Sequence, residues 1–169
     1  MNALKLMSLA ALLATGLSSA HAAADFITIT RSQQNLDDAT PRLLLNFTLP
    51  ATLNRSSLTA NSAVLTFEAL GSEFNYNEVY INPPTTVCTA NDTDANQAGS
   101  LGFVREHDDD NLKTEWAANQ IAFSSAQLVT GSNQLMVCIR NSTGGAGSGV
   151  GNLDNVSFKS IVLHYHTNP

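Results

Sequence analysis

Short segments in which every second residue is hydrophobic recur along this chain. In residues 43–49 the odd positions are Leu, Leu, Phe and Leu, whereas positions 46 and 48 are Asn and Thr. Residues 63–70 repeat the pattern, and Gly, Asn, Asp and Pro lie between such segments. A period of two is the period of a β-strand that buries one face, and the intervening residues are typical of turns. The pattern therefore predicts antiparallel β-structure.

Eight segments are predicted to be strands. They are residues 26–30, 43–49, 63–70, 78–82, 101–105, 120–123, 134–140 and 156–165. Helix signals are confined to residues 112–118, which is enough for a turn or two at most. Eight short strands with polar connections predict an all-β fold, an antiparallel two-sheet β-sandwich of the jelly-roll kind.

The first 22 residues have the composition of an export signal. Lys5 precedes an apolar stretch at residues 6–17, and residues 20–22 read Ala-His-Ala, the small-x-small form that a signal peptidase cleaves. This stretch is too short to cross a bilayer core of about 30 Å as a helix. We therefore expect residues 1–22 to be a signal peptide, residues 23–169 to form a single domain, and the product to be secreted or periplasmic without membrane insertion.

The charge balance limits the class of partner. Removing Lys5 from the 8 basic residues leaves 7 against 14 acidic residues, a formal charge of −7. No basic stripe is present to neutralise phosphates, so nucleic acid and anionic lipid are not expected partners. Acidity in an exported domain usually serves solubility and in some cases calcium binding.

Cys88 and Cys138 are the two cysteines of the chain. An even number of cysteines in an exported chain predicts a disulfide between them. Closing a loop of about 50 residues would stabilise the fold by about 4 kcal/mol on the chain-entropy model, less any strain. The alternative of catalytic or metal-bound thiols has neither a CxxC spacing nor a neighbouring histidine in its favour.

The second half of the chain carries an ordered series of motifs. EVYIN (residues 78–82) is followed by Trp116, then LVTGSNQLMVCI (residues 128–139), a glycine-rich stretch, and LDNVSFKSIVL (residues 153–163). This series, over about residues 62–165, resembles secreted galactose-binding-like jelly-roll domains, the fold of many carbohydrate-binding modules. The positions that carry the resemblance are Val79 to Asn82, Trp116, Leu128, Gly131, Asn133, Leu135, Asp154, Phe158, Ile161 and Leu163.

Two departures from that pattern are visible. Pro83 stands where such domains usually have a glycine after the strand, and a glycine tract lengthens the last connection. Local chemistry explains part of the motif without any family. Gly131 can supply a left-handed turn geometry, and Asn133 can close the same turn by bonding to its own backbone.

The resemblance implies a non-catalytic module that binds a carbohydrate or a cell-surface polymer through loops at one end of the sandwich. The longest polar connections are residues 89–100 and 141–152. We expect ligand contacts at Trp116, Tyr76 and Asn141, because a sugar ring packs on a flat aromatic face that has polar groups beside it. Packing at the edge of the core is the other role open to Trp116.

Two clusters could bind metal. The polar run at residues 106–111 could hold a structural calcium at Asp108, Asp109, Asp110 and Asn111, since calcium prefers six to eight oxygen ligands and jelly-roll modules that resemble this one often hold such an ion. A solvated acidic loop is the other interpretation of this run. No EF-hand spacing is present. His164 and His166 share one strand face at a chelating spacing, yet no third ligand is visible, and an exposed terminal strand explains them equally well.

No sequence motif indicates catalysis. The stretch GAGSGVG has neither the GxSxG order of a nucleophile elbow nor the GxGxxG order of a dinucleotide loop, so we do not expect an enzyme. The rival to the binding module is a structural or adhesive surface subunit that self-associates through exposed sheet edges. Chaperone-assembled pilins share the size and the single disulfide, but Cys138 lies too late in the chain for their pattern.

Overall fold

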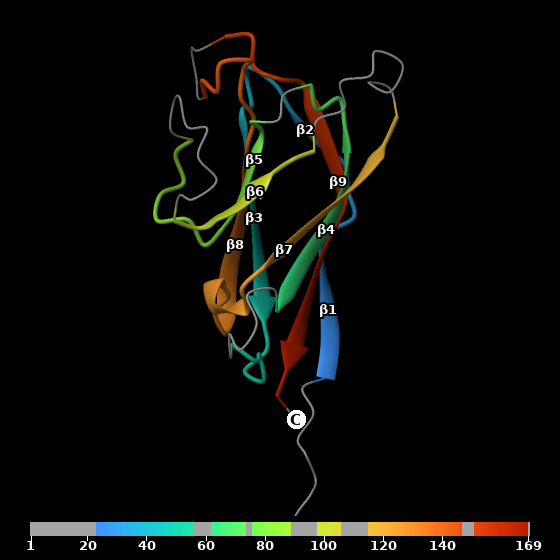
Figure 1. Cartoon of the computed structure of the whole chain (residues 1–169), viewed down its shortest axis with the longest axis vertical. Coiled ribbons are helices and arrows are strands. Elements are labelled where there is room, and N and C mark those ends of the chain that lie inside the picture. Colours follow the sequence, from blue (N-terminus) through green and yellow to red (C-terminus); the bar gives the residue numbers. More distant parts are fainter. Residues whose placement is uncertain are drawn as a thin grey trace, which may run out of the picture.

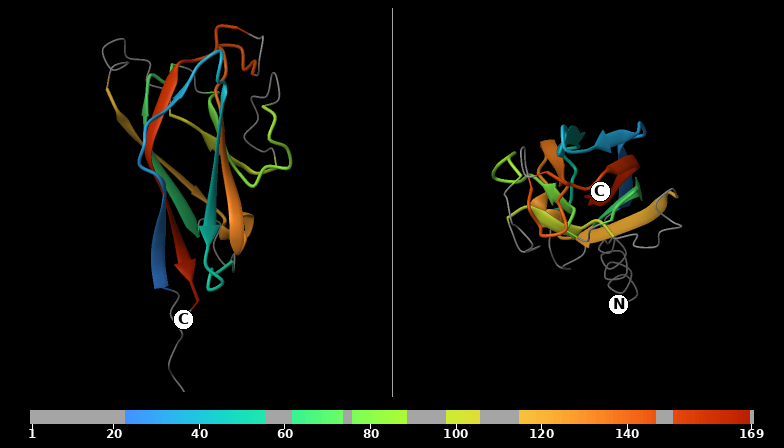
Figure 2. Two further views of the ribbon diagram at one scale, coloured as in Figure 1. Left: turned by 180° about the vertical axis from the view of Figure 1, so that it is seen from behind. Right: turned by 90° about the horizontal axis from the view of Figure 1, so that it is seen from above.

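The computed structural model describes residues 23–55, 62–73, 76–88, 98–105, 115–146 and 151–168. In these ranges the chain forms nine strands and one short 3-10 turn, arranged as two antiparallel sheets that face each other (Figures 1 and 2). The predicted all-β sandwich is confirmed. The expected signal peptide and the expected calcium ligands Asp108, Asp109, Asp110 and Asn111 lie outside the described residues and stay predictions.

The five-stranded sheet has the order β1-β9-β4-β7, and β2 also pairs with β9. Its strands are β1 (Ala23–Thr30), β2 (Gln34–Leu36), β4 (Ala63–Leu70), β7 (Ala117–Phe123) and β9 (Val156–Thr167). The four-stranded sheet has the order β3-β8-β5-β6. Its strands are β3 (Arg42–Leu49), β5 (Glu78–Ile81), β6 (Ser100–Phe103) and β8 (Gly131–Cys138).

All eight predicted strands are present, with boundaries shifted by a few residues. Strand β2 was not predicted, because its three residues include a single apolar side chain, Leu36. It forms because β9 is 12 residues long and β1 reaches only to Ile161, so the first part of β9 pairs with β2. Ala117 and Ala118, where a helical turn was considered, are strand residues because they pair with β4.

The main core lies between the sheets. Along β4 the odd residues from Ala63 to Ala69 are buried and the even ones are partly exposed, as the period of two predicts. Phe67 packs against Phe158 with ring centroids 5.8 Å apart. Side chains from both sheets complete this core, including Leu65, Val79, Leu135, Val137, Ile161 and Leu163.

A second, smaller core covers part of the outer face of the four-stranded sheet, over β5 and β8. It consists of Tyr80, Cys88, Met136, Cys138 and Ala146. The predicted disulfide joins Cys88 to Cys138 with their Cα atoms 5.8 Å apart, which confirms the pairing. Tyr80 alternates with Val79 and Ile81 along β5, so its side chain faces the opposite way and packs into this second core.

The turn before β8 is built as the sequence indicated. Gly131 has φ +83°, and the Asn133 side chain donates to the carbonyls of Val129 and Gly131 at 2.7 and 3.0 Å. Asn82 adds a contact that was not expected: its Nδ2 donates to Asn133 Oδ1 at 2.9 Å, and its own φ is +47°. Asparagine tolerates this left-handed region better than most residues, so β5 can end here and the chain can turn away at Pro83.

Candidate functional site

Among the described residues, one hollow lies on the outer surface of each sheet. The first, here called the sheet hollow, has a volume of about 310 Å³ and lies on the five-stranded sheet. The second, here called the proline pocket, has a volume of about 160 Å³ and lies on the four-stranded sheet. The sheet hollow is lined by Thr66, Phe67, Glu68, Ala118, Asn119, Gln120 and Ser160. The proline pocket is lined by Tyr80, Pro83, Pro84, Thr85, Val87, Ala98 and Met136.

Strand register explains the polar lining of the sheet hollow. Thr66 pairs with Gln120, and Glu68 pairs with Ala118, so these side chains project from the same outer face of β4 and β7. Between the levels of Thr66 and Glu68 the pairing of β4 with β9 shifts register. Ser160 lies at this irregularity with φ +52°, as expected for a β-bulge. The outward-facing lining residues therefore supply two hydroxyls, one amide and one carboxylate, whereas the Asn119 side chain is buried.

Trp116 lies beside this hollow and carries a cation over its ring. The Lys159 Nζ atom is 3.8 Å from the ring centroid, and it is 3.7 Å from an oxygen of Glu68. Glu68 in turn lines the hollow. The Trp116 side chain is half-buried and does not belong to either core cluster. Trp116 is thus linked to the sheet hollow through Lys159, which contacts one face of its ring and also Glu68 of the lining.

The structure distributes the three expected ligand contacts over both sheets. Trp116 precedes β7 of the five-stranded sheet, whereas Tyr76 precedes β5 and Asn141 follows β8 in the other sheet. The Asn141 Oδ1 atom accepts hydrogen bonds from the amide of Thr143 at 3.0 Å and of Gly145 at 2.8 Å. It therefore closes its own loop, and a ligand role for Tyr76 or Asn141 stays a prediction.

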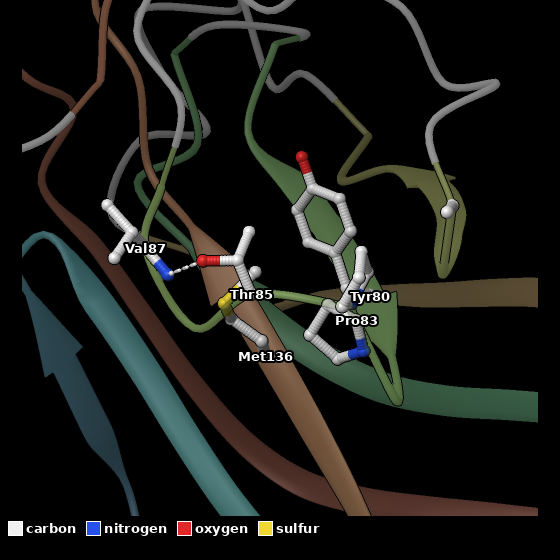
Figure 3. Close-up of a pocket in the computed structure, with 7 residues that line it drawn as sticks. Tyr80, Pro83, Thr85, Val87 and Met136 are labelled. Carbon is white, nitrogen blue, oxygen red and sulfur yellow. Dashed lines mark hydrogen bonds between the residues drawn. The ribbon is translucent and has the colours of Figure 1, made fainter.

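The proline pocket is formed by side chains from three parts of the chain. Tyr80 and Met136 are cross-strand partners on β5 and β8. Pro83, Thr85 and Val87 surround the same space, as Figure 3 shows. The Thr85 Oγ1 atom accepts a hydrogen bond from the Val87 amide at 3.2 Å, which fixes this segment. Among the described lining residues, Thr85 contributes a hydroxyl to an otherwise apolar wall, and the Tyr80 hydroxyl instead donates to the carboxylate of Glu78 behind the wall.

That carboxylate belongs to a buried ion pair that sequence reasoning missed. Glu78 and Arg140 are both fully buried, with 3.0 Å between Arg140 Nη2 and Glu78 Oε2. The hydroxyl of Tyr80 donates to Glu78 Oε2, and that of Ser100 donates to Oε1 at 2.7 Å. Arg140 Nη1 donates to the carbonyl of Gly144 at 3.1 Å. The available signal was a charged residue at the start of one predicted apolar strand and at the end of another, because such charges are buried only when paired.

The histidine pair on β9 is exposed. His164 lies against Phe26, with ring centroids 6.2 Å apart. In the ranges that the structure describes, no three His, Cys, Asp or Glu side chains are grouped so as to hold a metal ion. A helix long and apolar enough to cross a membrane is likewise absent from these ranges.

Comparison with known proteins gives matches at the level of solved structures. No protein-family model and no curated protein matches the chain. The chain is similar to a β-porphyranase of glycoside hydrolase family 86 from the human gut bacterium Bacteroides plebeius, with 12% identity and a TM-score of 0.42. That match covers 92% of this chain, which spans 22% of the length of the enzyme.

Two further matches span most of both proteins. A family 29 carbohydrate-binding module from Piromyces equi has 10% identity and a TM-score of 0.36, with 84% of this chain and 91% of the module covered. A cleaved adhesin domain of Lys-gingipain from Porphyromonas gingivalis has 10% identity and a TM-score of 0.32, with 83% of this chain and 97% of that domain covered. The chain is similar to these β-sandwich domains at low identity and low TM-scores.

Proposed function

We propose that this protein is an exported, non-catalytic module that binds a carbohydrate or a cell-surface polymer at the sheet hollow. The observation that supports the proposal is that Lys159 contacts both the half-buried ring of Trp116 and Glu68, a lining residue of this hollow. The Cys88–Cys138 disulfide is consistent with an oxidising compartment outside the cytoplasm.

The hollow has the size and chemistry that such a ligand needs. Its volume of about 310 Å³ lies at the lower end of the range for small-molecule sites, about 300 to 1,000 Å³. Sugars present many hydroxyl groups, which act as both donors and acceptors. Thr66, Gln120 and Ser160 offer both functions, and an ionised Glu68 offers acceptors only. The Trp116 ring supplies an apolar surface for the C–H face of a sugar.

Lys159 must move before a ligand can stack on the face of Trp116 that it covers. A cation over an exposed aromatic ring is worth about 0.5 to 1 kcal/mol, so displacing it costs little compared with the contacts that a ligand gains. After displacement the ammonium group can donate to ligand hydroxyls. Lys159 is therefore proposed to change partners on binding.

Electrostatics favour neutral glycans over polyanionic ones. Glu68 lines the hollow, and the expected mature chain has a formal charge of −7. A sulfated or uronate-rich polymer would be repelled at low ionic strength by both. Neutral polysaccharides should therefore bind more tightly than sulfated polymers of the same length.

The test is a binding screen with matched variants. Purified protein is assayed against soluble and insoluble neutral and sulfated glycans, and the best ligand is then titrated against Trp116→Ala, Gln120→Ala and Thr48→Ala. Thr48 is an exposed residue of β3 in the other sheet and serves as the control. Loss of the stacking ring should weaken binding by about 1 to 3 kcal/mol, roughly five- to 150-fold.

Gln120→Ala should weaken binding by a smaller factor, and Thr48→Ala should have no effect. Melting temperatures of all three variants establish that they remain folded. Absence of binding to every glycan tested, or equal affinities for the wild type and Trp116→Ala, would contradict the proposal. A loss confined to Asn141→Ala or Tyr76→Ala would instead move the site to the loops expected from the sequence.

A further inference from the structure

The described residues expose three large hydrophobic side chains to a marked degree. These are Phe26 at 62%, Val87 at 64% and Val129 at 37%. Phe26 projects from the outer face of the five-stranded sheet, because it shares a cross-strand row with the exposed His164. Val87 stands at the rim of the proline pocket on the other sheet. An exposed aromatic ring and an apolar pocket therefore occupy different faces of one molecule.

Phe26 is held in a projecting position. It belongs to β1, which lies at the edge of its sheet, and the ring of His164 lies against it at a centroid distance of 6.2 Å. Isolated exposed hydrophobic side chains are common, but an aromatic ring with nearly two thirds of its surface in water has much area to gain from burial.

The proline pocket matches one benzene ring in size and chemistry. Its volume is about 160 Å³, and an apolar cavity of about 150 Å³ in a protein is known to accept benzene. Pro83, Pro84, Val87 and Met136 supply apolar walls. The Tyr80 hydroxyl already donates to Glu78, so a purely apolar guest leaves that donor satisfied.

Opposite charges flank the ring and the pocket. Asp25 is exposed and precedes Phe26 on the edge strand. Arg42 is exposed at the start of β3, and its guanidinium donates to the carbonyl of Thr86 in the segment that walls the pocket. Charge complementarity of this kind orients two surfaces as they meet.

We infer that Phe26 of one copy of this chain inserts into the proline pocket of a second copy. The contact is heterologous, since ring and pocket are different surfaces of the molecule. Each copy in a pair still has one free ring or one free pocket, so association continues into chains and does not stop at a closed dimer. The proposal goes beyond ligand binding: β4 and β7, which supply most of the sheet hollow, lie two and three strands away from β1.

Sedimentation velocity on the purified protein tests the contact. A single inserted side chain makes a small interface, and small interfaces are weak, so the concentration series should extend to about 1 mM. The wild type should show a weight-average mass that rises continuously with concentration. Phe26→Ala and Val87→Asp should each weaken self-association at least about tenfold.

Val129→Ala is the matched control, because Val129 is the third exposed hydrophobic residue and lies outside the proline pocket. Its self-association should equal that of the wild type. Thermal melts with the disulfide intact confirm that all variants are folded, so a loss of association cannot arise from unfolding.

A mixing experiment distinguishes ring-into-pocket contact from other forms of association. Phe26→Ala retains only the pocket, and Val87→Asp retains only the ring. Each variant alone should be monomeric, whereas an equimolar mixture should form pairs of twice the monomer mass and nothing larger. A monomeric wild type across the whole series would overturn the proposal. So would a mixture that stays monomeric, or self-association that Phe26→Ala leaves unchanged.

Discussion

The two sheets of this sandwich treat their outer faces differently. The five-stranded sheet leaves its outer face open, and β4 accordingly alternates between buried and partly exposed residues. The four-stranded sheet is covered on its outer face over β5 and the second half of β8, so all four residues of β5 are buried, whereas β3 keeps exposed residues such as Thr48. The pattern of buried residues along a strand therefore depends on what packs on each of its two faces. In β5, side chains outside the sheet bury the face that would otherwise be exposed.

The comparison extends to one buried tyrosine in each sheet. Tyr80 lies in the small outer core and donates to Glu78, which also pairs with Arg140. Tyr165 lies in the main core and donates to Asp25 at 3.3 Å. Asp25 is exposed, whereas Glu78 is fully buried. The tyrosine–carboxylate hydrogen bond is therefore buried in the four-stranded sheet, whereas in the five-stranded sheet its carboxylate is exposed to solvent.

Removing one partner of the buried ion pair should have the largest effect. Arg140→Ala leaves the Glu78 carboxylate buried without its cation, which should lower the free energy of unfolding by about 3 to 5 kcal/mol. Urea denaturation at neutral pH measures the change. Arg140→Met and Glu78→Leu together remove both charges and should recover much of the loss. Equal stability of Arg140→Ala and the wild type would show that the outer core does not depend on the pair.

Removing the disulfide is expected to have the next largest effect. Replacing Cys88 and Cys138 by alanine should cost about 2 to 4 kcal/mol, because the unfolded chain regains the freedom of a long loop. Chemical denaturation of the double variant, compared with reduced wild type, gives the value. A loss below about 1 kcal/mol would indicate that contacts of Tyr80 and Met136 alone hold the outer layer in place.

The tyrosine of the main core predicts an alkaline transition. Burial, and next the charge of Asp25, raise the pKa of Tyr165 above its ordinary value of 10.0. In the unfolded chain the phenol loses its proton more readily. The stabilisation from Tyr165 is therefore complete below pH 10 and is lost as the pH rises through the raised pKa.

Tyr165→Phe should flatten this dependence and cost about 1 kcal/mol at neutral pH through the lost hydrogen bond. Melting temperatures from pH 8 to 11 provide the check. An alkaline decline equally steep in Tyr165→Phe and in the wild type would assign the transition to another group.

The exposed ion pair of the five-stranded sheet should show the smallest effect. Lys159 and Glu68 are partly solvated, so Lys159→Ala should change the free energy of unfolding by less than about 1 kcal/mol. The same substitution uncovers Trp116, the single tryptophan of the chain. Iodide quenching of its fluorescence should therefore increase. A loss of unfolding free energy as large as that of Arg140→Ala would show that the exposed ion pair stabilises the protein as much as the buried one.

Most of the fold could be predicted because its strands have one buried face. Residues 43–49 and 63–70 alternate in sequence, and the structure buries the corresponding side chains. Gly131 and Asn133 identified a turn through their own backbone chemistry. Strand β2 was not predicted, because it forms where β9 extends beyond its pairing with β1 and its own side chains give little signal.

The candidate site could be predicted only in part. Trp116 was expected from the sequence as a flat aromatic face for a sugar; in the structure its ring contacts Lys159, which also contacts Glu68 of the sheet hollow, and its ligand role stays a prediction. The hollow itself joins Thr66, Gln120 and Ser160, which are up to 94 residues apart in sequence and meet through strand register and a bulge. No local signal marks a bulge at Ser160, since serine is common on strand surfaces.

By itself the sequence determined the all-β class, the strand segments other than β2 and the pairing of its two cysteines. These properties depend on side-chain period, on turn chemistry and on the count of thiols, all of which are local or compositional. Only the tertiary structure decided which face of each sheet is covered, where Arg140 finds Glu78, and which polar residues share the sheet hollow. The physical reason is that burial and electrostatic pairing depend on distances between strands that are remote in sequence, and a one-dimensional pattern does not contain those distances.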